Sequence, residues 1–231
     1  MKKLRLLLGG LAVGAVVTFM PSISRATIIG SAHDFTASTN YWINGTVNWV
    51  SRSNVCGVCH VIHHANPDRS APLWAHASTI QTFIVYSSPT FQGGTPTINA
   101  SSKACLSCHD GSIAINQSYA ATGTNYTGGT AVYIQSHAII PDGTPANDLS
   151  NMHPIGFNYQ TAQSADPDIK PSTTIVPGTS QTIAQAMLKG GQVECGSCHD
   201  IHRTKGASAS SGIFTIVSSA GSALCLTCHS K

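Results

Sequence analysis

Cys56-Gly57-Val58-Cys59-His60 is the first of four copies of one pattern, Cys-x-x-Cys-His, and we call it motif 1. Motifs 2, 3 and 4 are Cys105-Leu106-Ser107-Cys108-His109, Cys195-Gly196-Ser197-Cys198-His199 and Cys225-Leu226-Thr227-Cys228-His229, and the four motifs use all eight cysteines. This spacing is typical of covalent c-type haem attachment, in which both thiols bond to haem vinyl groups and the adjacent histidine ligates the iron. The sequence therefore predicts four covalent haem c groups, with His60, His109, His199 and His229 as iron ligands.

Paired cysteines at this spacing also occur in disulfides and in four-cysteine zinc sites. Neither alternative requires a histidine after the second cysteine, and histidine makes up only 11 of the 231 residues. A histidine nevertheless follows all four pairs. The pattern therefore favours haem over zinc or disulfides.

The first 26 residues have the features of an export signal. Lys2, Lys3 and Arg5 precede an apolar stretch at residues 6–20, and a small-residue cleavage pattern ends at Ala26. The apolar stretch is shorter than the ~20 residues of a membrane span. We therefore expect residues 1–26 to be removed, leaving an exported chain in the periplasm, in the extracellular space or at the cell surface, with no membrane span. A signal retained as an anchor is the alternative.

Removal of the signal changes the charge of the chain. The full sequence has 12 basic and 9 acidic side chains, and loss of the four basic residues before residue 27 leaves 8 basic against 9 acidic, a formal charge of −1. Haem propionates would add negative charge. Because the chain has neither a basic run nor a positive field, we expect no nucleic-acid partner.

The composition indicates a largely irregular chain. Residues 87–102, 122–130 and 142–150 are dominated by small, polar and turn-forming residues, as in loops. Apolar residues are too sparse for a conventional core of this size. We therefore expect a mostly irregular multihaem cytochrome c fold with short α-helices at the haem motifs, little β-structure and a core built around four stacked haems, so that folding depends on haem.

Local patterns predict few elements outside the motifs. Residues 180–189 have helical spacing and end at Gly190-Gly191, and residues 82–86 and 131–135 are strand candidates. The chain also repeats internally, since each half has an upstream histidine followed by two motifs. The repeat predicts three parts after the signal: a first dihaem unit at residues 27–115, a loop-rich connecting segment with a distal histidine at 116–180, and a second dihaem unit at 181–231.

Seven histidines lie outside the motifs and are candidates for the sixth ligand of each iron: His33, His63, His64, His76, His137, His153 and His202. His63 and His202 each follow a motif histidine by three residues. Two histidines on opposite faces of one haem have Cα atoms roughly 12 Å apart, whereas three residues of extended chain reach only about 10 to 11 Å. Each must therefore serve a haem other than that of its neighbouring motif histidine.

The repeat adds His33 and His153, each of which lies upstream of its unit. His76 is a fifth candidate, because imidazole suits iron, and a surplus ligand could serve another copy of the chain. His64 is the local alternative to His63, while His137 is expected to be structural. Methionine ligation through Met152 or Met187 is an alternative that the number of histidines makes unnecessary.

The wider sequence resembles small exported tetrahaem cytochromes of metal-respiring bacteria. The similar segments are SAHDF at 31–35, CGVCHVIHHA at 56–65, PLWAH at 72–76, CLSCHDG at 105–111, LSNMHPIGF at 149–157 and GGQVECGSCHDIH at 190–202. This group includes the OmcE-type cytochromes, some of which form extracellular filaments with a continuous haem stack, where a histidine of one subunit ligates a haem in the next. The resemblance implies a similar role for the surplus histidine of this chain.

Iron with two axial ligands has no open site for a substrate, so we expect electron transfer and no enzymatic activity. The low charge favours a subunit of a haem-stacked filament over a discrete periplasmic shuttle, which would need a charged docking surface. The expected partners are other cytochromes, a quinol-linked donor, a terminal acceptor and further copies of the chain. A multihaem redox enzyme with one open-coordinate haem is the alternative from another class.

Overall fold

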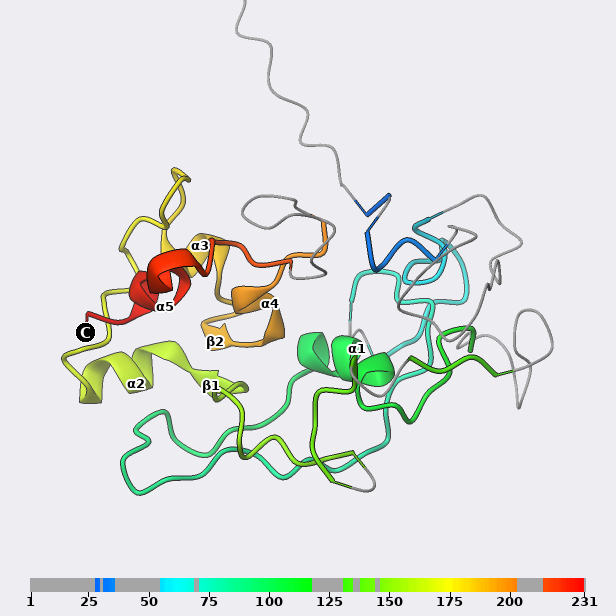
Figure 1. Ribbon diagram of the computed structural model, residues 1–231, viewed down its shortest axis with the longest axis horizontal. Helices are drawn as coiled ribbons and strands as arrows, with labels where there is room; N and C mark the ends of the chain where they lie inside the picture. The colour runs from blue at the N-terminus through cyan, green and yellow to red at the C-terminus, as the bar shows by residue number, and fades with distance from the viewer. Residues whose placement is uncertain are drawn as a thin grey trace, which may run out of the picture.

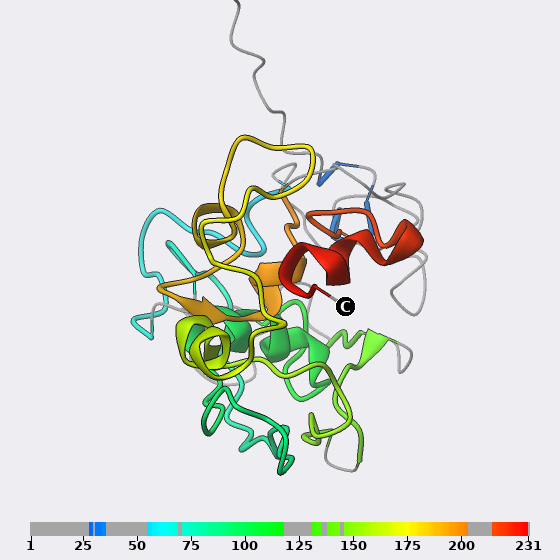
Figure 2. The ribbon, with the colours of Figure 1, turned by 90° about the vertical axis from the view of Figure 1, so that its left-hand side faces the viewer.

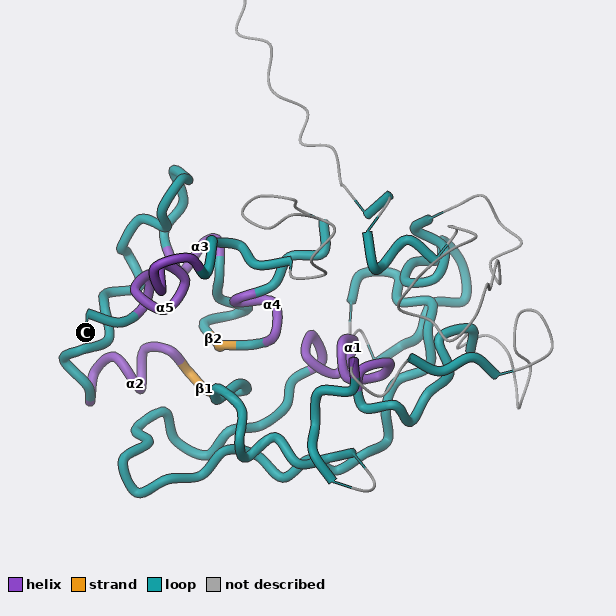
Figure 3. The backbone as a smooth tube through the Cα atoms, in the orientation of Figure 1, coloured by secondary structure: helices purple, strands orange, loops and turns teal. Residues whose placement is uncertain are grey.

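The computed structural model describes residues 28–29, 31–35, 55–68, 71–117, 131–134, 138–143, 146–202 and 214–230. The expected signal at residues 1–26 and His137 lie outside these ranges. Loops and turns form most of the described chain (Figure 3). The helices are α1 (Ala100–His109), α2 (Tyr159–Ala165), α3 (Ile183–Ala186), α4 (Cys195–Cys198) and α5 (Ala223–Cys228), with a 3-10 turn, η3 (Ala220–Ser222), before α5.

One small sheet joins two segments that are distant in the sequence. Strand β1 (Phe157–Asn158) pairs antiparallel with β2 (Gln192–Val193), and Phe157 lies opposite Val193. Among the described residues, none of the helices has both the length and the apolar character needed to cross a membrane. In the part of the chain that the structure describes, the low helix content and the single short sheet agree with the irregular chain that the composition indicates.

The four motifs follow one another along the long axis of the molecule. Figure 1 shows α5 near the C-terminal end, α4 and then α1 towards the middle, and the cyan segment that contains motif 1 on the far side of α1. Viewed from the end that carries the C-terminus, α5 lies in front of the other motifs (Figure 2). The sequence order of the motifs is therefore also their order in space.

The main apolar cluster lies in the C-terminal part of the chain. Its buried members come from residues 157–217: Phe157, Tyr159, Ala162, Val176, Ile183, Ala186, Met187, Val193, Ile216 and Val217. A second cluster contains only Phe35 and Ile115 as buried members. Apolar packing therefore joins part of the expected connecting segment to the second dihaem unit.

The sequence predicts short helices at the haem motifs, and the structure has them at three of the four. Motif 2 ends α1, motif 3 provides all of α4, and motif 4 ends α5 with His229 as the C-cap. Motif 1 forms a hydrogen-bonded turn without a helix, and its His60 N–H donates to Cys56 O at 2.9 Å. The same local turn therefore occurs with or without a helix around it.

The helix predicted over residues 180–189 is shorter in the structure. Only α3 forms, and it begins with a capping box in which the Thr182 hydroxyl accepts from the Gln185 N–H and the Gln185 side chain accepts from the Thr182 N–H. The chain then turns back so that Lys189 pairs with Gln192 at the start of β2. The prediction of a longer helix was wrong because this reversal, with Gly190 and Gly191 at positive φ, begins soon after one helical turn.

The two predicted strands do not form among the described residues. Within residues 82–86, only Ile84 makes a bridge, to Asp148, with its N–H donating to Asn147 O at 2.9 Å. Residues 131–134 contain no strand, and residue 135 lies outside the described ranges. The β-forming side chains favour extended backbone, but the segment beside residues 82–86 pairs with it only at the bridge between Ile84 and Asp148. A single bridge does not make a strand.

Gly156 connects β1 and β2 to the segment before α1. Its N–H donates to Val193 O at 2.6 Å, and its carbonyl accepts from the Thr97 N–H at 2.7 Å. Its φ is +80°, and an added Cβ would collide with the Thr97 carbonyl. This position therefore requires glycine for both its backbone conformation and the space around it.

We expect Gly156→Ala to lower the free energy of unfolding by about 2–3 kcal/mol, because it combines left-handed backbone strain with a backbone clash. Gly94→Ala is the matched control, since Gly94 has a φ of +79° but no atom within 4 Å of the added Cβ. Denaturant unfolding of the haem-loaded proteins measures the difference. Equal losses in the two variants would contradict the clash with Thr97.

Candidate functional site

Each motif folds so that its two cysteines and its histidine lie on one local turn. The histidine N–H donates to the carbonyl of the first cysteine at 3.1 Å in motif 3 and at 2.9 Å in motifs 1 and 4, while motif 2 ends a regular helix. None of the eight cysteines, all within the described ranges, forms a disulfide. This backbone arrangement fits attachment of one haem by two thiols and one imidazole from a single short segment.

Three motifs are held by the same pair of backbone hydrogen bonds, which we call the clamp. After motif 1, Val61 N–H donates to Leu73 O and Ala75 N–H donates to Cys59 O. In motif 3, the Asp200 N–H donates to Phe214 O and the Ile216 N–H donates to Cys198 O. In motif 4, the Ser230 N–H donates to Asp168 O and the Lys170 N–H donates to Cys228 O. A separate segment therefore fixes the end of each of these turns.

Backbone carbonyls orient two motif histidines as iron ligands require. His60 Nδ1 lies 2.6 Å from Pro72 O, and His109 Nδ1 lies 2.8 Å from Ala138 O. A carbonyl can only accept, so Nδ1 carries the proton and Nε2 keeps its lone pair. Metal-ligating histidines are held in this way by a hydrogen bond from the second ring nitrogen. The residues present therefore fit a haem at both motifs.

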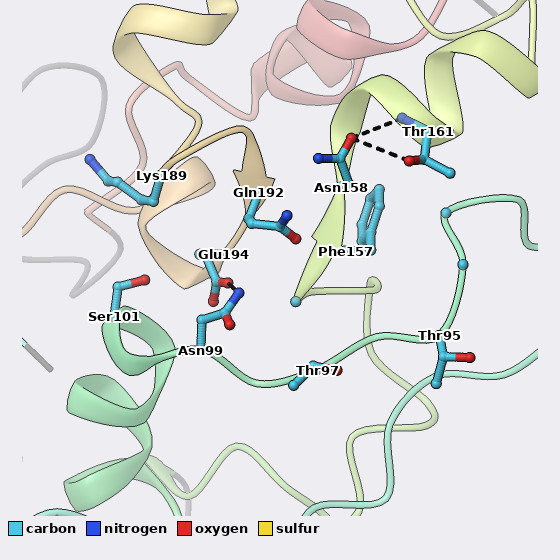
Figure 4. Close-up of a pocket in the computed structure, with 13 residues that line it drawn as sticks. Thr95, Thr97, Asn99, Ser101, Phe157, Asn158, Thr161, Lys189, Gln192 and Glu194 are labelled. Carbon is cyan, nitrogen blue, oxygen red and sulfur yellow. Dashed lines mark hydrogen bonds between the residues drawn. The ribbon is translucent and has the colours of Figure 1, made fainter. Parts of the chain in front are cut away.

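A buried carboxylate joins motif 2 to motif 3. Glu194 immediately precedes motif 3 and is 1% exposed. Its carboxylate accepts from Asn99 Nδ2 at 2.6 Å (Figure 4). It also accepts from the hydroxyl of Ser102, which like Asn99 lies near the start of α1. Ser102 Oγ also accepts from the Cys195 N–H at 3.1 Å. The beginning of α4 is therefore fixed to the helix that carries motif 2.

The Glu194 contacts lie in the wall of an open polar cavity of about 590 Å³. Figure 4 shows Lys189, Gln192 and Thr97 around the same space. Asn158 caps α2 there, and its side-chain oxygen accepts from the Thr161 N–H at 3.0 Å. The polar groups of this wall thus include both a cap for α2 and the link between α1 and α4.

Thiols of consecutive motifs lie close enough to influence one another. Burial raises the pKa of Cys59 in motif 1 to about 12, and Cys108 of motif 2 adds to this shift. A hydrogen bond between Cys105 and Cys195 links motif 2 to motif 3, raising the pKa of Cys105 and lowering that of Cys195. Thiols of motifs 1 and 2, and thiols of motifs 2 and 3, therefore influence one another's pKa values.

The thiols of motif 4 also affect the pKa of a thiol in motif 3. Burial raises the pKa of Cys198 to about 11, with further contributions from Cys228, Cys195 and Cys225. Motif 4 is held in place by Lys170, whose Nζ donates to Leu226 O at 2.6 Å. A cation at this position satisfies a carbonyl near the C-terminal end of α5.

Three of the predicted distal histidines lie against motif histidines. The ring centroids of His33 and His109 are 6.1 Å apart, those of His60 and His202 are 6.1 Å apart, and those of His153 and His229 are 6.4 Å apart. Each pair contains one motif histidine and one histidine from elsewhere in the chain. His202 faces the histidine of motif 1, although it follows motif 3 in the sequence.

His76 lies in a different environment. It is 1% exposed, with Nδ1 2.8 Å from Ala77 O and Nε2 2.9 Å from Ala114 O. Its Nε2 is also 3.8 Å from Cys108 Sγ. The structure thus places His76 beside an attachment cysteine, with backbone carbonyls at both ring nitrogens.

His63 and His64 are both exposed, and His64 has a φ of +58°. No ring contact joins either residue to a motif histidine in the described part of the chain. Their sequence neighbour His60 is paired with His202. His63 therefore stays a candidate distal ligand, with His64 as its local alternative.

Sequence reasoning missed Glu194, which organises the site without touching a haem ligand. Glu194 is the only glutamate in the chain, and it stands directly before a Cys-x-x-Cys-His motif. A lone acidic residue at that position was the available signal. Its partners Asn99 and Ser102 lie in the other half of the chain, so the spacing of residues alone could not reveal them.

Comparison with known protein families supports the chemistry of the motifs. Residues 186–231 match the family described as "Doubled CXXCH motif". This match identifies the features of a multihaem c-type cytochrome that takes part in electron transfer, with haem c bound covalently through CXXCH motifs. No curated protein matches the chain.

Proposed function

We propose that this exported chain carries four covalent haem c groups and conducts electrons along them, without acting as an enzyme. The observation that carries the proposal is the order of the four motifs, and so of their thiols, along the long axis of the molecule (Figure 1), where hydrogen bonds of Asn99 and Ser102 with Glu194 join motif 2 to motif 3. Groups attached to these thiols would form one continuous run. Cys56 and Cys225 are the two exposed cysteines, and they belong to the first and last motifs. This exposure supports electron exchange at the two ends.

The protein contributes attachment, ligation and shielding, while bound haem supplies one-electron redox chemistry. The motif cysteines would hold the groups and the motif histidines would occupy one axial position on each iron. The distal ligands are drawn from His33, His63, His76, His153 and His202. Two imidazoles on each iron leave no position for a substrate, which supports a carrier over a catalyst.

Apolar residues beside both terminal motifs support end-to-end association of copies of this chain. Ile62 is 78% exposed and follows motif 1, while Leu73 is 52% exposed and belongs to the clamp of that motif. Leu226 within motif 4 is 40% exposed. Burial of these side chains between copies would bring a terminal haem of one subunit towards that of the next. We therefore propose a subunit of an extracellular, haem-stacked filament, as the resemblance to OmcE-type cytochromes suggests.

A filament of this kind needs other proteins at its two ends. Because transfer through haem iron moves one electron at a time, the proposed partners are redox proteins: other cytochromes, a quinol-linked donor and a terminal acceptor. A location outside the cytoplasm, either in the periplasm or beyond the cell surface, would give access to both kinds of partner. Apart from these partners, the chain would contact only further copies of itself.

Cryo-electron microscopy of the protein recovered from the extracellular fraction tests this proposal, with intact mass giving the number of attached haems. We expect filaments with four six-coordinate haems in each subunit. Discrete particles would overturn the filament and leave a periplasmic shuttle. A haem with an open axial position would instead support a multihaem redox enzyme.

A further inference from the structure

We infer that His202, His33 and His153 are the distal iron ligands of the haems at motifs 1, 2 and 4, respectively. The inference rests on the proposed four-haem function and deepens it by assigning ligands to individual haems. Its main consequence is that the motif 1 haem takes its two ligands from opposite halves of the chain. The pairing of His60 with His202 would then join the two dihaem units through one iron.

The distances between the paired rings support the assignment. Two metal–nitrogen bonds of about 2 Å, with about 1 Å from each nitrogen to its ring centroid, place two axial imidazoles about 6 Å apart. The three observed separations are 6.1, 6.1 and 6.4 Å. Ordinary ring packing can give similar distances, but within the described ranges every histidine pair combines one motif residue with one distal candidate. The pairs also use each of these six histidines once.

His33 is held by aromatic side chains while it faces His109. Its Nδ1 is buried. Phe35 packs edge to face against the imidazole, with ring centroids 6.0 Å apart and an interplanar angle of 72°. The ring packs against Phe214, with centroids 4.9 Å apart, which restricts its orientation.

The internal repeat gives the same rule in both halves. The upstream histidine of each half, His33 or His153, faces the second motif of its own half. His202, which follows the first motif of the second half, faces the first motif of the other half. His63 follows motif 1 as His202 follows motif 3, so it is the counterpart of His202 in the first half. By the same rule, His63 is the distal ligand of the haem at motif 3, opposite His199.

The clamp explains why His76 stands apart from this set. In the clamp, the carbonyl of Leu73 accepts at motif 1 as that of Phe214 does at motif 3. The N–H of Ala75 likewise donates at motif 1 as that of Ile216 does at motif 3. His76 therefore corresponds to Val217, which is a buried apolar residue. The proposed ligands occur as histidine in both halves, His33 with His153 and His63 with His202. The position of His76 has histidine in the first half only. We assign His76 a structural role beside Cys108.

Paired substitutions can identify two ligands of the same haem. His202→Ala should convert one of the four haems from low to high spin and allow one carbon monoxide to bind per reduced chain. His60→Ala removes the other ligand of that haem, or prevents its attachment, and intact mass distinguishes these results. In either case, adding His202→Ala to His60→Ala should affect no further haem. Electron paramagnetic resonance and carbon monoxide titration count the altered haems.

The control pair is His60→Ala with His153→Ala, which we assign to different haems and which should alter two. His64→Ala should leave every haem low spin, while His63→Ala with His199→Ala should alter only one. Additive effects of His60→Ala and His202→Ala would overturn the assignment, as would an unchanged spectrum for His202→Ala. Fewer than four haems, or a high-spin haem in the unsubstituted protein, would instead contradict the proposed function.

Discussion

Replacing Cys195 and Cys198 with alanine should leave a chain with three haems and interrupt electron transfer between its ends. Motif 3 lies between motifs 2 and 4 along the long axis of the molecule (Figure 1), and its Cys195 N–H donates to Ser102 Oγ of α1. Loss of the haem at this position would open a gap in the run. Because electron tunnelling falls exponentially with distance, we expect transfer across that gap to slow by orders of magnitude. Pulsed reduction followed by time-resolved haem spectra measures this rate.

The double variant Cys225→Ala with Cys228→Ala is the matched control. It also removes one haem, but motif 4 lies at the end of the run, so motifs 1, 2 and 3 remain neighbours. Intact mass should show the same haem count in both variants. Fast equilibration among the three remaining haems is expected only in this control. Equal rates in the two proteins would contradict the order of motifs described above.

Replacing Glu194 with alanine should lower the free energy of unfolding by about 3–5 kcal/mol, since hydrogen bonds to a charged group contribute about 1.5–3 kcal/mol each. The substitution would leave Asn99 Nδ2 and the buried Ser102 hydroxyl without their acceptor. It would also loosen the link between α4 and α1, because Glu194 orients the Ser102 hydroxyl that accepts from the Cys195 N–H. Denaturant unfolding of the haem-loaded protein measures the loss.

Glu194→Gln separates the role of the charge from that of the shape. Glutamine has the same size and keeps one acceptor oxygen, so we expect a smaller loss than for alanine. The coupling between the haems of motifs 2 and 3, seen as a splitting in redox titrations, should change more in the alanine variant. A stability equal to that of the unsubstituted protein in both variants would show that the buried carboxylate does not join the two motifs.

The sequence predicted the parts of this site that depend on local spacing. A Cys-x-x-Cys-His segment closes its own turn, so the four local turns could be located from the residues alone. The steric argument that His202 must serve a haem other than that of His199 agrees with its place beside His60. Chain reach over three residues is a local property and needs no knowledge of the fold.

Features that depend on distant partners could not be predicted in this way. Residues 180–189 have helical spacing, but the reversal towards β2 allows only one turn from Ile183 to Ala186. Ile84 lies in a β-forming stretch but finds one bridging partner, Asp148. Glu194 was missed because its partners lie in α1. In each case the outcome was decided by a segment far away in the sequence.

The pairs that cross between halves have a consequence for how the protein matures. Each motif can present its thiols from a local turn, whereas His60 meets His202, and His33 meets Phe214, only when the two halves of the chain come together. Contacts of such high sequence separation form late and slow the folding of a chain. Haem attachment to an extended chain would then precede its compaction. The cell would have to load the polypeptide while its hydrophobic segments are still accessible, during the period when aggregation and proteolysis compete with assembly.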